Sequence, residues 1–261
     1  MTIAFIGAGN MAGSLIRGLQ AGGYSANDIV AADPVQRQLD TLATLGVSTT
    51  GNNAQAVAQA EIVVLAIKPQ ITGDVVQALP ALQPDQLVIS IVAGIDTRSL
   101  GDWLPDRQPI VRCMPNTPAL LGAGITGLYA NSWVTNIQRG KAEAILNGVG
   151  SSVWVSEEGQ LDAVTAISGS GPAYYFLLME SMIESAQALG LDATASQRLA
   201  VETARGAALM ACEPKADPST LRRNVTSPGG TTEAALKVMQ EENLSSIVDR
   251  ALSAAKQRAE V

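Results

Sequence analysis

Hydrophobic positions follow two different patterns along the chain. Up to about residue 157, short runs of consecutive apolar residues alternate with segments whose apolar positions recur every three or four residues. The short runs are typical of strands buried on both faces of a parallel sheet, and the periodic segments are typical of amphipathic helices. The strand-like runs lie at residues 3–6, 29–32, 47–49, 62–67, 87–92, 110–113, 125–130 and 153–155. The helix-like segments among them lie at residues 11–22, 35–45, 53–59 and 135–148. The pattern predicts an α/β domain with about eight strands in a mostly parallel sheet.

From residue 158 onward every periodic segment is typical of a helix. The helices are expected at residues 160–167, 173–189, 193–212, 218–223, 232–241 and 244–259. The apolar residues of 174–189 cover most of the circumference of their helix, so we expect this helix to be buried against several partners. About a hundred residues form only a small core of their own, so we expect the excess apolar surface to pack against a second copy of the chain. The predicted organisation is an α/β domain at 1–157 and an all-α domain at 158–261 that forms a homodimer, with higher homo-oligomers left open.

Composition narrows the chemistry that this fold could carry. The 261 residues include no histidine, which excludes a Ser-His-Asp hydrolase and removes the commonest metal ligand, so we expect no metal site. The net charge of −7 and the lack of a Lys/Arg cluster argue against nucleic-acid binding. Cys113 and Cys212 lie far apart, which fits a reducing cytoplasm. We expect no membrane segment, because no uncharged apolar run is long enough to span a bilayer.

A glycine-rich loop follows the first predicted strand and opens a helix. Its sequence is Gly7, Ala8, Gly9, Asn10, Met11 and Ala12. In a strand–loop–helix unit of this kind, the first glycine makes the tight turn and the second lets a pyrophosphate approach the backbone. The pyrophosphate then meets the free N–H groups of the helix N-terminus. The loop therefore predicts a dinucleotide cofactor.

Two residues after the second strand bear on the choice of cofactor. Asp33 lies about 20 positions after Ala12, where an acidic residue would bind the ribose 2′-hydroxyl of NAD. It could instead cap the following helix, which Pro34 would then begin. Arg37, one turn later, could face the 2′-phosphate of NADP. These residues leave NAD and NADP equally open.

Other candidate residues follow the central strands, at the edge where open α/β sheets bind ligands. Lys68 ends the most apolar run and precedes Pro69; it is either a cofactor or substrate contact or a solvated strand terminus. Asn116 lies in a loop fixed by two prolines, where its amide could hold a nicotinamide carboxamide or satisfy the loop backbone.

Two glycine-rich stretches belong to the helical half. Residues 168–171 read Ser-Gly-Ser-Gly before Pro172, which suits the first turn of a helix. Residues 227–232 place Gly229 and Gly230 among hydroxyl side chains just before another helix. Such a segment forms an anion nest that could bind a carboxylate, although helix capping explains it equally well.

Five stretches together resemble the pyrroline-5-carboxylate reductase family. They match the family's order and spacing over nearly the whole chain, and the last stretch is the most specific. The matching stretches are residues 7–12, 66–70, 114–119, 168–174 and 225–232. The resemblance implies a Rossmann domain, a helical domain intertwined with that of a partner subunit, and a reduced nicotinamide cofactor, more often NADPH than NADH. Asp33 departs from common family patterns, so the cofactor preference stays open.

The resemblance also implies a reaction and a set of site residues. The family reduces 1-pyrroline-5-carboxylate, a cyclic imine, to L-proline, the last step of proline biosynthesis. We expect Thr232 to bond the ring nitrogen and the 227–232 nest to hold the carboxylate. The predicted substrate contacts are Ser168, Gly169, Ser227, Gly229, Gly230, Thr231 and Thr232. The predicted cofactor contacts are Gly7, Ala8, Gly9, Asn10, Met11, Ala12, Asp33, Arg37, Asn53, Ala66, Ile67, Lys68, Pro69, Ala93, Gly94 and Asn116.

Two other functions compete with this interpretation. One is a related Rossmann-plus-helical reductase of the 3-hydroxyacid dehydrogenase or imine reductase kind, which would place a lysine to protonate an alkoxide. The lysines of the helical half lie in no recognisable site motif. The other is a nicotinamide-sensing module that binds the cofactor without turnover, and it would not need the 227–232 nest.

Overall fold

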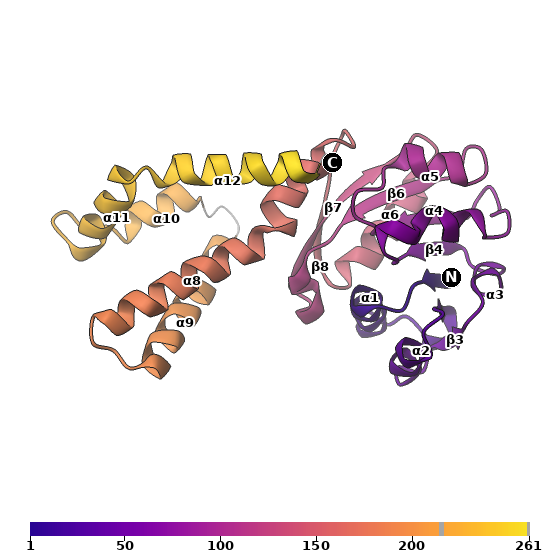
Figure 1. Cartoon of the computed structure of the whole chain (residues 1–261), viewed down its shortest axis with the longest axis horizontal. Helices are drawn as coiled ribbons and strands as arrows, with labels where there is room; N and C mark the ends of the chain where they lie inside the picture. Colours follow the sequence, from indigo (N-terminus) through magenta and orange to yellow (C-terminus); the bar gives the residue numbers. More distant parts are fainter. Residues whose placement is uncertain (214–216, 260–261) are drawn as a thin grey trace. The chain divides into compact units, whose positions relative to one another are not determined.

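The computed structural model describes residues 1–213 and 217–259 and divides the chain into two compact units. The first unit contains residues 1–170 together with the end of the chain from Ala255, and the second contains Gly171–Ala254. Helices and strands are labelled in Figure 1. The boundary predicted after residue 157 precedes the division between these units and stays a prediction.

Among the described residues, eight strands form one sheet in the first unit, in the order β3-β2-β1-β4-β5-β6-β7-β8. All neighbouring pairs are parallel except β6 and β7. The strands are β1 (Ile3–Ile6), β2 (Ile29–Ala32), β3 (Ser48–Thr50), β4 (Ile62–Leu65), β5 (Leu87–Ser90), β6 (Ile110–Met114), β7 (Gly124–Ala130) and β8 (Gly150–Trp154). The prediction of a mostly parallel sheet is confirmed.

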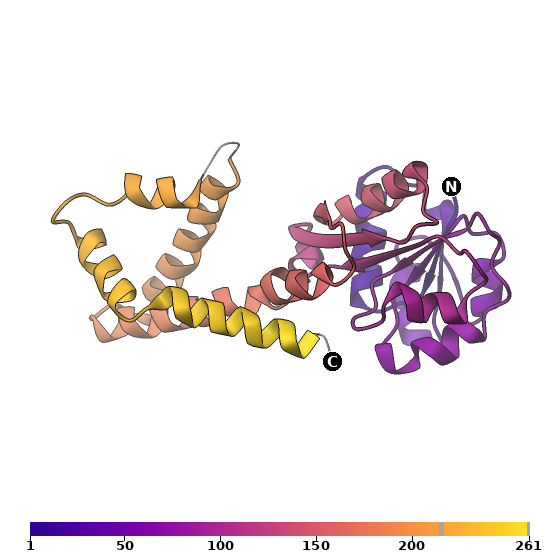
Figure 2. The same cartoon turned by 90° about the horizontal axis from the view of Figure 1, so that it is seen from above.

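Helices cover both faces of this sheet (Figures 1 and 2). The α-helices of the first unit are α1 (Asn10–Ala21), α2 (Gln36–Ala43), α3 (Asn53–Val57), α4 (Pro69–Gln77), α5 (Thr97–Trp103), α6 (Asn136–Asn147) and α7 (Gln160–Val164). Successive side chains of β1 point to opposite faces, so Phe5 joins a core with α1, α2 and α6, and Ile6 joins one with α3, α4 and α5. Burial on both faces explains why these strands contain consecutive apolar residues.

Helices α1 and α6 approach closely at a glycine. A Cβ at Gly18 would lie 2.2 Å from the carbonyl oxygen of Gly148, so alanine requires the backbone to move. We expect Gly18→Ala to lower the free energy of unfolding by about 1–3 kcal/mol, because overpacking strains the core. Gly140→Ala in α6 is the matched control: a Cβ there meets no atom within 4 Å, and alanine favours the helix. Urea unfolding of both variants checks this, and equal stabilities would contradict the close contact.

The second unit is helical, as predicted, and its helices expose much apolar surface. They are α8 (Gly171–Ala188), α9 (Ala193–Ala211), α10 (Pro218–Asn224), α11 (Thr231–Glu241) and α12 (Leu244–Ala259), which continues into the first unit. Helix α8 packs against α9, yet Phe176 and Leu177 are 64% and 63% exposed. None of the described residues of α10, α11 or α12 is buried. The burial expected for residues 174–189 is therefore not achieved within one chain.

Two helices, α4 and α5, lie outside the elements predicted from the sequence. Both are short and carry an internal glycine, Gly73 and Gly101, which weakens a helical pattern.

Among the described residues, none of the helices combines the length and the hydropathy that a membrane span requires.

Candidate active site

The glycine-rich loop crosses the carboxyl ends of the central strands. Gly7 has a φ of +100°, and a Cβ there would lie 2.3 Å from the carbonyl oxygen of Ala66, so only glycine fits. At Gly9, by contrast, a Cβ would meet no atom within 4 Å, so space is open beside the backbone. The first-turn N–H groups of Asn10, Met11 and Ala12 have no hydrogen-bond partner in residues 1–213 and 217–259. This open helix N-terminus has the geometry of a pyrophosphate site.

Asp33 is held against this loop by its own carboxylate. Oδ2 accepts a hydrogen bond from the Ala8 N–H at 2.8 Å, and Oδ1 accepts one from the Val35 N–H at 2.8 Å. The capping alternative is partly right, because Asp33 caps the turn, but α2 begins at Gln36 after the N-cap Val35. Arg37, in the first turn of α2, is exposed to solvent. Both residues lie at the edge predicted for the adenosine ribose.

The other predicted cofactor residues lie at the same edge of the sheet. Ala66 and Ile67 directly follow β4, and Lys68 is the exposed N-cap position of α4, with Pro69 at its first position. Asn53 begins α3, which the side chain of Asn52 caps. Ala93 and Gly94 form an exposed turn after β5, where Gly94 has a φ of +72°. The first unit thus brings together all of the predicted cofactor residues.

Asn116 satisfies the backbone of its own surroundings, as the second interpretation of this residue proposed. Its Oδ1 accepts from the Ile125 N–H at 3.0 Å, and its Nδ2 donates to the Ser168 carbonyl at 3.1 Å. The side chain is nearly buried, at 9% exposure for the residue. The amide therefore fixes the loop after β6 to the segment that carries Ser168, and a direct nicotinamide contact stays a prediction.

Ser168 and Gly169 lie in a π-helical turn, η3 (Thr165–Gly169), that continues α7. The Ser170 N–H donates to the Thr165 carbonyl at 2.8 Å, which closes this wider turn. A Cβ at Gly169 would lie 2.8 Å from the Met114 methyl group at the end of β6. Wide turns of this kind are frequent at functional sites, and this one sets Ser168 beside Asn116.

A cavity of about 290 Å³ opens beside these residues. Its lining includes Ala93, Gly94, Arg112, Met114, Asp162 and Thr165. Asp96, the N-cap residue of α5, follows the turn of Ala93 and Gly94. Hydrogen bonding with the Ser99 side chain and, less strongly, the charge of Arg112 lower the pKa of Asp96 below its usual value. Burial raises the pKa of the Cys113 thiol, so this lining residue stays protonated and is no nucleophile.

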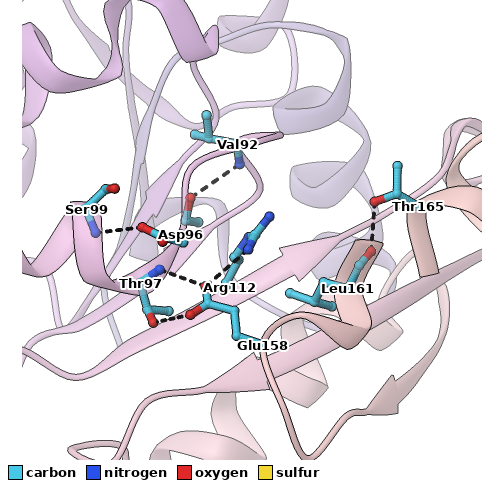
Figure 3. Close-up of polar contacts among 9 residues, drawn as sticks. Val92, Asp96, Thr97, Ser99, Arg112, Glu158, Leu161 and Thr165 are labelled. Atoms are coloured by element: carbon cyan, nitrogen blue, oxygen red, sulfur yellow. Dashed lines mark hydrogen bonds and ion pairs between the residues drawn. The ribbon is translucent and has the colours of Figure 1, made fainter. Parts of the chain in front are cut away.

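Sequence reasoning missed the polar cluster at this cavity. Glu158 accepts hydrogen bonds from Thr97 and pairs with Arg112 at 3.2 Å, with both charged side chains largely buried (Figure 3). A signal was available, because Arg112 interrupts the apolar run of β6, and charged residues are rarely buried without a partner. That the partner of Arg112 is Glu158, just before α7, could not be predicted from the same pattern.

The predicted anion nest belongs to the second unit. Gly229 has a φ of +70°, and the Gly230 N–H donates to the Ser227 carbonyl at 3.0 Å. The first-turn N–H groups of Thr231, Thr232 and the following Glu233 have no partner among the residues that the structure describes. Sequence reasoning also missed that the Glu233 carboxylate accepts from the Gly229 N–H at 2.7 Å, so the loop is already held in shape.

Both halves of the chain match known family models. Residues 158–261 match the model for pyrroline-5-carboxylate reductase dimerisation, and residues 2–94 match the model described as NADP oxidoreductase coenzyme F420-dependent. A pyrroline-5-carboxylate reductase of Pseudomonas aeruginosa is 52% identical over 98% of this chain and 95% of its own length.

Solved structures agree with these matches. The structure of a pyrroline-5-carboxylate reductase from Coxiella burnetii is 44% identical, with a TM-score of 0.97, and covers 99% of this chain and 97% of that chain. The NADP-bound pyrroline carboxylate reductase of Plasmodium falciparum is 27% identical, with a TM-score of 0.86, over 100% of this chain and 97% of that chain. The chain is therefore a member of the pyrroline-5-carboxylate reductase family.

Proposed function

We propose that this chain reduces 1-pyrroline-5-carboxylate to L-proline with NADPH, with the 227–232 nest as the substrate carboxylate site. The observation that carries the proposal is the match to reductases of that name over nearly the whole chain. The two open helix N-termini support it, since one can take the pyrophosphate of a dinucleotide and the other a carboxylate. The absence of histidine is no obstacle, because this reduction needs no imidazole.

The residues of the first unit fit a dinucleotide. The open space beside Gly9 and the unpaired N–H groups after it would hold the pyrophosphate, and the exposed turn of Ala93 and Gly94 would meet the nicotinamide. When bound, NADPH supplies the hydride, which leaves C4 of the nicotinamide with its electron pair and joins the imine carbon. What the chain adds is orientation of the two reacting carbons and exclusion of water.

The substrate would be held by its carboxylate and by its ring nitrogen. The N–H groups of Thr231 and Thr232, without partners among the described residues, lie in the first turn of α11, where the helix dipole favours an anion. The half-buried Thr232 hydroxyl would accept one hydrogen bond from the protonated ring nitrogen, which keeps the iminium oriented. Ser168 and Gly169, in the first unit, stay predicted substrate contacts. A protonated substrate accepts hydride without a further acid, so no proton donor is required.

The hydrogen bonds of Asp33 and the exposure of Arg37 favour NADPH over NADH. Both carboxylate oxygens of Asp33 already accept backbone hydrogen bonds, while the guanidinium of Arg37 is exposed and suits a 2′-phosphate. We expect Arg37→Ala to lower kcat/KM with NADPH by about 10-fold, the loss of one charge-assisted hydrogen bond, and to leave kcat/KM with NADH unchanged. Steady-state rates with both cofactors check this, with Arg37→Lys as the charge-preserving control. Equal losses with both cofactors would contradict it.

We infer that the chain assembles as a homodimer in the cytoplasm. The exposed apolar residues of α8 and the matched dimerisation region support a homodimer. Cys113 and Cys212 are both free thiols, which fits a reducing cytoplasm.

The test is oxidation of NADPH by the purified protein when 1-pyrroline-5-carboxylate is added, with proline measured by amino-acid analysis. Proline formed in proportion to NADPH consumed supports the proposal. Cofactor binding without proline formation would refute it.

A further inference from the structure

We infer that Glu158 is a positioning residue that couples the turn beside the nicotinamide to the segment beside the substrate. The inference rests on the proposed function for the identity of those two ligands. The coupling between the turn and the segment is inferred from the hydrogen bonds of Glu158 (Figure 3).

Three hydrogen bonds converge on the Glu158 carboxylate. Oε1 accepts from the Thr97 N–H at 2.7 Å and from Arg112 Nη1 at 3.2 Å, and Oε2 accepts from the Thr97 hydroxyl at 2.6 Å. The side chains of Glu158 and Arg112 are only 21% and 13% exposed. Charge-assisted hydrogen bonds in such a shielded place are stronger and more directional than those at an open surface.

On the cofactor side, Glu158 holds the end of the turn that contains Ala93 and Gly94. Thr97 is the first residue of α5, and Asp96 before it caps that helix by accepting from the Ser99 N–H at 2.7 Å. At the other end of the turn, the Val92 N–H donates to the Ser90 hydroxyl at 3.3 Å. The turn is thus fixed at both ends, and Glu158 supplies the contacts from outside the β5–α5 connection.

On the substrate side, Glu158 begins the segment that ends in Ser168 and Gly169. Its carbonyl accepts from the Leu161 N–H at 2.9 Å as α7 starts. The Thr165 hydroxyl donates to the Leu161 carbonyl at 2.8 Å, which joins α7 to the π-helical turn. Arg112 and Thr165 both line the cavity beside Ala93 and Gly94. A shift of Glu158 would therefore move both sides of the cavity.

Glu158→Gln tests the coupling with little change in volume. The amide oxygen can take the place of Oε1, but the NH₂ group then faces the Thr97 hydroxyl, which can no longer donate to this side chain, and the negative charge that pairs with Arg112 is lost. We expect amide hydrogen exchange to become faster both in the 93–97 turn and in residues 165–169. We also expect kcat to fall by about 10-fold, since small misplacements of reacting groups are costly, while NADPH affinity stays close to that of the wild type because the phosphates bind elsewhere.

Two matched variants separate positioning from general destabilisation. Glu61→Gln removes the same charge from a more exposed ion pair, to Lys141 at 3.0 Å. Glu61 lies before the start of β4 and does not line the cavity, so its replacement should change neither readout. Glu158→Asp keeps the charge and should recover part of kcat. The deuterium isotope effect on kcat, measured with NADPH deuterated at C4, should increase in Glu158→Gln as hydride transfer becomes slower.

Two results would overturn the inference. One is a wild-type kcat in Glu158→Gln. The other is exchange that quickens evenly through the first unit, with an unchanged isotope effect, which would make Glu158 merely stabilising. Failure of the proposed function is distinguishable, because the wild-type protein would then form no proline.

Discussion

Replacing Phe176 by aspartate should prevent the chain from assembling with further copies and should remove nearly all activity. Phe176 lies on α8 and is 64% exposed in the single chain, within a run of exposed apolar residues. Burying such a side chain in an interface contributes about 1.5–3 kcal/mol, and an unpaired carboxylate buried in its place costs several kcal/mol more. Light scattering coupled to size-exclusion chromatography measures the assembly, and the proline-forming assay measures the activity.

Ile137→Asp is the matched control for this substitution. Ile137 lies on α6 in the first unit and is 75% exposed, so aspartate there should leave both assembly and activity unchanged. An oligomer of wild-type size for Phe176→Asp would contradict the proposal that the α8 face is covered by another copy.

Replacing Thr232 by alanine should lower kcat/KM for 1-pyrroline-5-carboxylate by about 10–100-fold, the loss of one or two hydrogen bonds to the substrate. Thr232 lies in the first turn of α11, and its side chain makes no hydrogen bond within the described part of the chain. The fold should therefore tolerate the change. Initial rates at varied substrate concentration measure the effect.

The control is Thr232→Ser, which keeps the hydroxyl and removes only a methyl group. It should retain most of the wild-type kcat/KM, and both variants should keep the wild-type affinity for NADPH. An unchanged rate in Thr232→Ala would remove this residue from the mechanism.

The elements that the sequence predicts well are those with strong local patterns. The runs that form β1 and β4 are apolar throughout because both faces of these strands are buried, and they are readable without any knowledge of the fold. Helix α12 was predicted with its observed bounds, because its apolar positions recur regularly. Helix α5 was missed because seven residues with an internal glycine carry too little periodicity.

The candidate site is less predictable, because its residues find partners far along the chain. The glycine-rich loop could be located because Gly7 and Gly9 serve local backbone needs. The contact of Asp33 with Ala8 and the contact of Asn116 with Ser168 join residues that no local pattern links. The same holds for Glu158, whose partners Thr97 and Arg112 lie on other elements.

The exposed apolar surface of α8 shows a second limit of prediction from the sequence. Its sequence correctly indicated a helix that is apolar on most sides, but a single chain leaves Phe176 and Leu177 uncovered. Hydrophobicity predicts that such a surface will be buried, and it does not say by which chain.

Transfer of label from the cofactor to proline tests the central claim most directly. The protein would be incubated with 1-pyrroline-5-carboxylate and NADPH that carries deuterium at both C4 positions, and the proline would be examined by mass spectrometry and NMR. We expect one deuterium atom in each proline, on the carbon that was the imine carbon, because that carbon accepts the hydride. Proline without deuterium, or NADPH that binds and is never oxidised, would contradict the assignment of this chain as an active reductase.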